Sequence, residues 1–201
     1  LDRQLLLLDE PLGALDWVTK QEVSDYLRDI HDRLGLTVLH VTHDFTEALD
    51  LATSVGVIHE GRLLQVGTPE DIFRRPANRT VASFVGMPNL WPATNGVCAE
   101  CPLLRQIRES VRPPSAKEAW LCVRPDHVVL EGGDGDLSGI SSQGTVQTVR
   151  WRGASYDVVV DVGTPLVASM GSRDFRALDC RVGDMVNVVL DPQHVHVMAD
   201  A

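Results

Sequence analysis

Four consecutive leucines at positions 5–8 run directly into the acidic pair Asp9 and Glu10 and then into Pro11. An unbroken apolar run of this kind is typical of a strand that is buried on both faces of a parallel sheet. Ligand sites of such sheets lie at the carboxyl ends of their strands. The run therefore predicts an α/β fold whose first strand presents two carboxylates to a cleft. The alternative is that the acidic pair only caps the turn that follows.

The residues after this run continue the alternation of strand and helix. Apolar residues at helical spacing predict a helix over 23–34, and Gly35 is a natural stop for it. The β-rich stretch 37–41 predicts a second strand, and the amphipathic stretch 45–52 predicts a second, shorter helix. A tight hairpin turn is expected at Glu60-Gly61. This order of elements is that of an α/β domain.

The second part of the chain is β-rich. From Ala119 onward, short apolar runs are separated by Gly, Asp, Ser and Pro, as in a small barrel or sandwich. The expected strands lie at 120–123, 145–151, 156–162, 166–170, 185–190 and 195–198. Between the two parts, the proline-containing residues 88–118 are expected to form a linker and a variable segment. We therefore divide the chain into residues 1–87, 88–118 and 119–201.

Charge and composition restrict the partners. A net charge of −10 repels a polyphosphate backbone, and an aromatic content of 5% is low for base stacking, so no nucleic-acid partner is expected. No run approaches the roughly 20 apolar residues that cross a bilayer, so membrane association is expected to need a partner. The chain begins at Leu1 without an initiator methionine, directly before a strand-like run, and we interpret it as lacking an N-terminal part.

Two segments have a superficial likeness to metal sites. Cys98 and Cys101 form a Cys-x-x-Cys pair, but a zinc site would need a second pair and a redox site would need a βαβ setting. We expect these two residues, like Cys122 and Cys180, to be ordinary thiols. The acidic, glycine-rich residues 131–136 do not have the ligand spacing of a calcium loop and are expected to form a mobile loop.

Two motifs in the first part point to a known family. The sequence LLLLDEPLGALD at residues 5–16 resembles the Walker B strand and D-loop of ABC ATPases. Downstream, Val41-Thr42-His43-Asp44 resembles the switch-histidine loop of the same family. The resemblance covers residues 1 to about 87. It implies the C-terminal half of a P-loop nucleotide-binding domain of the α/β class.

The resemblance also implies a role for each matching residue. Asp9 would be the Mg²⁺ partner, acting through a coordinated water, and Glu10 the general base that orients the attacking water. Asp16 would lie at a dimer interface and communicate between two nucleotide sites. His43 would contact the γ-phosphate of ATP and so distinguish ATP from ADP. The other histidines of this part match no such motif: His31, His40 and His59.

Several parts of a nucleotide site are not found in this sequence. It contains no Gly-x-x-x-x-Gly-Lys-Ser/Thr phosphate loop, no signature sequence and no glutamine loop of the family. We therefore expect the 201 residues alone neither to bind ATP tightly nor to hydrolyse it. ATP and Mg²⁺ are the expected cofactors of the complete protein, which the resemblance implies to be a transport-coupled ATPase.

The remaining motifs resemble those of bacterial solute importers. Segments within residues 60–86 resemble the end of the motor domain in importer ATPases, and residues 123–128, 144–162 and 183–197 resemble the OB-like TOBE domain. This domain occurs in importers of molybdate, sulfate, iron, polyamines and sugars. The resemblance implies a regulatory role, through binding of the solute or docking of a protein, and a dimerisation module without a ligand is the alternative.

The transported solute stays open. Residues 162–168 and 195–197 resemble the molybdate/tungstate version of the TOBE domain. However, the Ser-x-Arg-Asn turn of such oxyanion sites is not found before Gly144, where residues 137–143 read LSGISSQ. Serine hydroxyls and turn amides could hold an oxyanion there, but without the arginine.

Two functions are therefore compared. The first is the ATP-hydrolysing subunit of a bacterial ABC importer, acting as a homodimer beneath two transmembrane permease subunits. Such a subunit would be cytoplasmic and peripheral on the inner face of the plasma membrane. The second is a stand-alone module in which residues 88–201 sense a small oxyanion or dock a partner, and the motor segment is vestigial.

Overall fold

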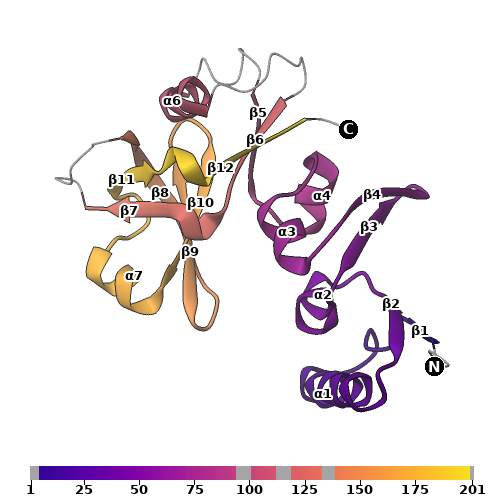
Figure 1. The fold of residues 1–201 in the computed structure, drawn as a ribbon. Helices are drawn as coiled ribbons and strands as arrows, with labels where there is room; N and C mark the ends of the chain where they lie inside the picture. The colour runs from indigo at the N-terminus through magenta and orange to yellow at the C-terminus, as the bar shows by residue number, and fades with distance from the viewer. Residues whose placement is uncertain (1–4, 94–100, 112–118, 133–138, 200–201) are drawn as a thin grey trace. The chain divides into compact units, whose positions relative to one another are not determined.

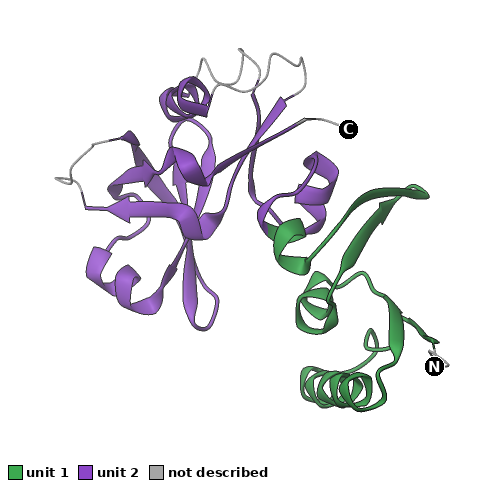
Figure 2. Cartoon of the chain, in the orientation of Figure 1, with its two compact units in different colours: residues 1–73 green, residues 74–201 purple. Residues whose placement is uncertain are grey.

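The structure is a computed structural model that describes residues 5–93, 101–111, 119–132 and 139–199. The chain divides into two compact units, residues 1–73 and residues 74–201 (Figure 2). Each unit is described by itself. None of the helices among the described residues combines the length and the apolar composition needed to span a bilayer.

The first unit begins with strands and helices in alternation (Figure 1). Its elements are β1 (Leu5–Asp9), α1 (Trp17–Leu34), β2 (Thr37–Val41), α2 (Phe45–Leu51), β3 (Val55–His59), β4 (Arg62–Gly67) and α3 (Pro69–Arg74). β1 and β2 pair in parallel, with Leu5 opposite Thr37 and Asp9 opposite Val41. The order of elements expected from the sequence over residues 5–52 is therefore observed.

Local signals set the boundaries of these elements. Asp16 caps the start of α1, and Gly35 ends it in the left-handed conformation, donating its N–H to the carbonyl of His31. Glu60 and Gly61 both have positive φ angles, 48° and 72°, as a tight type I′ turn requires. β3 and β4 pair antiparallel across this turn, so the predicted hairpin is confirmed.

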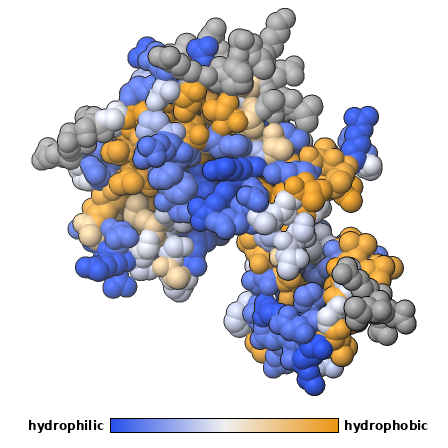
Figure 3. Space-filling view, viewed as in Figure 1, coloured by the Kyte–Doolittle hydropathy of each residue, from blue (hydrophilic) through white to orange (hydrophobic). Residues whose placement is uncertain are grey.

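One face of the β1–β2 sheet is exposed, which differs from the expectation that β1 is buried on both faces. Leu5 and Leu7 are 60% and 63% exposed, and Leu39 and Val41 lie on the same face. The reason is that side chains alternate between the two faces of a strand, and only the other face is partly covered in the described part of this unit. Figure 3 shows apolar surface in the region of these strands.

The second unit is built around two antiparallel sheets. One contains five strands in the order β10-β9-β8-β11-β7, and the other contains three in the order β12-β6-β5. The strands are β5 (Asn89–Pro92), β6 (Ala119–Val123), β7 (Val128–Glu131), β8 (Ile140–Trp151), β9 (Ser155–Asp161), β10 (Pro165–Gly171), β11 (Met185–Leu190) and β12 (Val195–Ala199). The helices are α4 (Arg79–Phe84), α6 (Pro102–Val111), α7 (Ser172–Leu178) and the short 3₁₀ turns η1 (Pro125–His127) and η2 (Pro192–His194).

The segment expected to be a linker, residues 88–118, contains two elements that are part of the second unit. β5 pairs with β6, and α6 places Leu103, Leu104 and Ile107 in the same apolar core as the strands. The expectation was based on proline content, but Pro92 ends β5 and Pro102 opens α6, where a proline needs no amide hydrogen. These prolines therefore delimit elements and do not mark a connector.

Two amide side chains attach β5 and α6 to the sheets. Asn89 donates from Nδ2 to the carbonyl of Val167 at 2.7 Å and accepts at Oδ1 from its N–H at 2.8 Å. Gln106 of α6 makes the same pair of bonds with the backbone of Ser141, at 2.9 and 3.1 Å. Each amide thus satisfies a backbone donor and acceptor together, as a neighbouring strand would.

Candidate functional site

The parallel pairing of β1 and β2 brings two predicted site residues together. The N–H of Glu10 donates to the carbonyl of Val41 at 2.9 Å, which continues the ladder one residue beyond β1. His43 lies two positions after the end of β2, and its Nδ1 is 3.1 Å from Oε1 of Glu10. Both side chains are exposed, at 74% for His43 and 55% for Glu10. The pair can therefore meet a ligand from solvent.

The backbone of Glu10 is in an unusual conformation. Its φ of 44° lies in the left-handed region, which a non-glycine residue adopts only when its surroundings enforce it. The Glu10 carbonyl accepts from the N–H of Gly13 at 3.3 Å, so a tight turn follows directly. Backbone strain of this type is concentrated at functional sites, and here it lies at the carboxylate nearest to His43.

Asp9 is the last residue of β1 and its side chain is exposed. Its carboxylate oxygens are the ligands that Mg²⁺ prefers, and Mg²⁺ is usually held by one or two carboxylates together with water and substrate phosphates. The exposed Asp9 carboxylate is compatible with that mode of binding. No group of three or more His, Cys, Asp or Glu side chains within the described ranges could hold a metal ion.

Asp16 has a structural task in this conformation. Its Oδ1 accepts from the N–H groups of Val18 and Thr19, both at 3.1 Å, and its Oδ2 accepts from the hydroxyl of Thr19 at 2.7 Å. The hydrogen bond from the Thr19 hydroxyl, helped by that from its backbone, holds the pKa of Asp16 below its usual value. Glu10 and His43 are thus brought together, whereas the Asp16 carboxylate is engaged at the start of α1.

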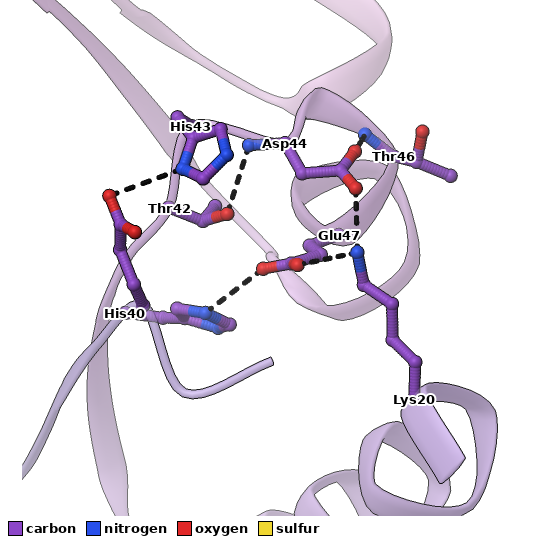
Figure 4. Close-up of polar contacts among 8 residues, drawn as sticks. Lys20, His40, Thr42, His43, Asp44, Thr46 and Glu47 are labelled. Carbon is purple, nitrogen blue, oxygen red and sulfur yellow. Dashed lines mark hydrogen bonds and ion pairs between the residues drawn. The ribbon is translucent and has the colours of Figure 1, made fainter. Parts of the chain in front are cut away.

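A polar cluster that sequence reasoning missed lies beside the His43 loop (Figure 4). The Nζ of Lys20, on α1, lies 2.6 Å from Oδ2 of Asp44 and 2.7 Å from Oε1 of Glu47. Glu47 is only 4% exposed, and its second oxygen lies 3.4 Å from Nε2 of His40 without hydrogen-bond geometry. Burial raises the pKa of Glu47, but hydrogen bonds from Lys20 and Thr42 outweigh it, so the net shift is downward.

The charges of this cluster support one another. The hydrogen bond from Lys20 also lowers the pKa of Asp44, and the two carboxylates raise the pKa of Lys20. The sequence carried no direct signal for the cluster, since Lys20 lies 24 positions before Asp44 and 27 before Glu47, on a different helix. What the sequence lacked was the packing that brings the two helices together.

Other predicted features of the second unit fall partly outside the described residues. Cys98 and residues 133–138 are among these. Cys101 is buried, and its thiol donates to the carbonyl of Val162 at 3.2 Å. Residues 140–143, expected to precede the first long strand, lie within β8, where Ser141 bonds to Gln106.

Known proteins are similar to this chain in both of its parts. The family profile described as "TOBE domain" matches residues 121–198. The spermidine/putrescine import ATP-binding protein PotA of Borreliella afzelii is 35% identical over 98% of this chain and 55% of its own length. The same-named protein of Clostridium acetobutylicum is 32% identical over 97% and 53%. The sulfate/thiosulfate import ATP-binding protein CysA of Xylella fastidiosa is 39% identical over 69% of this chain and 40% of its own length.

The chain therefore spans about half the length of the curated relatives it matches. Among solved structures, the cytoplasmic molybdate-binding protein ModG, with molybdate bound, matches at 18% identity and a TM-score of 0.39. That match covers 46% of this chain and 69% of the other.

Proposed function

Because this chain belongs to the family of ABC importer ATP-binding proteins and carries their TOBE domain, we propose that it contributes the water-activating and phosphate-sensing residues of a transport ATPase. Residues 1 to about 87 are then the C-terminal half of a P-loop nucleotide-binding domain, which includes the first unit and the beginning of the second. The complete protein hydrolyses ATP as a homodimer beneath two permease subunits on the cytoplasmic face of the membrane and so drives solute uptake.

The observation that carries this proposal is the 3.1 Å contact between Glu10 and His43. It lies at the carboxyl ends of two parallel strands, where ligand sites of α/β folds are found. A carboxylate there can accept a proton from an attacking water. The His43 ring, when both nitrogens are protonated, can donate from Nδ1 to Glu10 and from Nε2 to a phosphate oxygen. The left-handed φ of Glu10 sets the direction in which its side chain leaves the backbone.

Each of the predicted site residues has a separate role in this proposal. Glu10 orients the water and holds its proton on a carboxylate oxygen, while His43, in contact with Glu10, reports on the terminal phosphate. Asp9 would hold Mg²⁺, which supplies charge neutralisation of the nucleotide phosphates when bound. Asp16, through its cap on α1, would transmit changes at the dimer interface to the first turn of that helix.

The test uses the complete protein and the variant Glu10→Gln, which keeps the size of the side chain and removes the base. We expect ATP binding to be retained and turnover to fall by a factor on the order of 100 or more. Glu22→Gln removes the same charge from an exposed position of α1 and should leave turnover unchanged. Wild-type turnover in Glu10→Gln would refute the role of the base.

A second measurement concerns the 201 residues alone. Because this sequence has no phosphate loop, we expect an ATP titration of the isolated chain to show no tight site and no hydrolysis. A micromolar, Mg²⁺-dependent affinity would contradict this expectation.

For the second unit we propose a regulatory role in the same importer. Thermal-shift measurements with spermidine, sulfate, molybdate and tungstate test it directly, because a ligand at 100 times its dissociation constant stabilises the domain that binds it by roughly 2.7 kcal/mol. A shift with one solute would assign the domain to sensing that solute. The absence of a shift with all four would favour protein docking.

A further inference from the structure

The loop that carries His43 is held at both of its other residues. Asp44 accepts from Lys20 and from the N–H of Thr46, at 2.6 and 2.8 Å, and its own N–H donates to the Thr42 hydroxyl at 3.0 Å. The Thr42 side chain in turn hydrogen bonds to Glu47. Asp44 therefore contacts Lys20 and the first turn of α2, and Thr42 contacts Glu47.

His43 itself has little to hold it in place. Its ring is 74% exposed, and its contact with Glu10 joins it to another exposed side chain. The position of such a ring depends on the backbone that carries it. The backbone of residues 42–44 is thus the part of the site that must be kept rigid from outside.

The Lys20–Glu47 pair has the properties of such an external support. Glu47 is almost completely buried, and a buried carboxylate is stable only with a charged partner and hydrogen bonds. Lys20 supplies that charge and, at 2.6 and 2.7 Å, contacts both Asp44 and Glu47 with one ammonium group. It reaches them from the second turn of α1, where its N–H donates to the carbonyl of Asp16 at 2.9 Å.

We propose that Lys20 and Glu47 are positioning residues for His43: they fix the Thr42–Asp44 loop against α1 and α2 and so set the distance between His43 and Glu10. This inference rests on the proposed function of His43. Both residues act through the loop, which they contact at Asp44 and Thr42. Misplacing a reacting group by about 1 Å can reduce turnover about 100-fold, so the effect of losing the support should be large.

The experiment compares five variants in the complete protein by kcat and KM for ATP. We expect Lys20→Met to lower kcat by roughly 10- to 100-fold with little change in KM, because phosphate contacts made elsewhere bind the nucleotide. Lys20→Arg keeps the charge and should restore kcat to within a few-fold of wild type. Arg33→Met removes a cation from an exposed ion pair on the same helix and should change nothing.

A double variant separates positioning from folding. Replacing both members of a buried ion pair by apolar side chains of similar size is often neutral for stability. Lys20→Met combined with Glu47→Met should therefore regain the melting temperature that Lys20→Met loses. It should keep the low kcat, because Asp44 has lost its contact with Lys20 and Thr42 its contact with Glu47. Recovery of both together would show that the pair has only a structural role and would overturn the inference.

The same assay distinguishes this inference from the function on which it rests. Wild-type turnover in His43→Ala would overturn the proposed function. Loss of turnover in His43→Ala, together with wild-type kcat in Lys20→Met, would overturn the positioning role alone.

Discussion

Gly144 lies in the middle of β8, where the chain leaves no room for a side chain. It is buried and pairs with Val186 of β11. A Cβ at this position would lie 2.5 Å from Cγ1 of Val160, 2.7 Å from Cγ1 of Val162 and 2.8 Å from the carbonyl oxygen of Asp161. Non-bonded carbon atoms are best separated by about 3.5–4.0 Å, so the nearest contact is too short by about 1 Å.

The neighbours of Gly144 cannot easily move away. The β-branched side chain of valine is restricted at χ1, and the Asp161 oxygen belongs to the backbone of β9. Gly144→Ala must therefore push β8 and β9 apart, and overpacking of this type costs about 1–3 kcal/mol. We expect the upper end, about 3 kcal/mol, reduced by roughly 0.5 kcal/mol because alanine restricts the unfolded chain. The result is a loss of about 2.5 kcal/mol, or about 10 °C in melting temperature.

Urea unfolding followed by tryptophan fluorescence measures this loss, since the buried Trp91 reports on the second unit. Gly132→Ala is the matched control, because a Cβ there meets nothing within 4 Å. We expect its free energy of unfolding to stay within about 0.5 kcal/mol of wild type. If Gly144→Ala is equally stable, the close approach of β8 and β9 is not present in solution.

Three further results are expected. Ile107→Ala in α6 should destabilise the second unit by about 2–5 kcal/mol, whereas Arg105→Ala, at an exposed position of the same helix, should not. Equal free energies of unfolding for the two variants in urea would show that α6 does not pack in the core. Burial raises the pKa of Cys122 to about 12. In a Cys98→Ser variant, this thiol should therefore react with a disulfide reagent at pH 8 only after unfolding, and mass spectrometry detects the modified residue. The pKa of Glu47 is lowered on folding, so its contribution to stability is present at neutral pH and is lost as the pH falls below about 4.3. The decrease in urea midpoint between pH 7 and pH 3.5 should therefore be smaller in Glu47→Gln than in the wild type.

The sequence predicted those parts of the fold that depend on local signals. The stop at Gly35, the turn at Glu60-Gly61 and most strands of the second unit are where short-range patterns indicated them. The start of β8 at Ile140 was missed because residues 140–144 are largely polar and small, and they form a strand through pairing with β11. The helix α7 was missed for a similar reason, since its seven residues include little apolar periodicity.

The sequence likewise predicted only the part of the candidate site that depends on local signals. The proximity of Glu10 and His43 follows from two apolar runs that pair in parallel, although 33 residues separate the two in sequence. Lys20 and Glu47 carried no comparable signal, because charged residues on helices are usually solvated. Their partnership depends on how α1 and α2 pack, which is a tertiary property. The assignment of Asp9, Glu10, Asp16 and His43 to individual steps stays a prediction.

A repeated turn links the two sheets of the second unit, and the sequence contained it. Pro125-Asp126-His127-Val128 and Pro192-Gln193-His194-Val195 share the pattern Pro-x-His-Val. Each forms a 3₁₀ turn in which the histidine N–H donates, at 3.0 Å, to the carbonyl of the residue before the proline. η1 leads from β6 in the three-stranded sheet to β7 in the five-stranded one, and η2 leads from β11 back to β12.

The two turns meet at their histidines. The rings of His127 and His194 stack with centroids 4.0 Å apart and planes inclined by 24°. Burial and then the neighbouring His194 lower the pKa of His127, so the uncharged ring is favoured and stacking avoids the repulsion of two cations. Because the proline of each turn fixes φ and the repeated hydrogen bond fixes the direction of exit, the same four-residue pattern can carry the chain across in either direction. The crossing between sheets is therefore encoded locally, although the sheets themselves are formed by residues far apart in sequence.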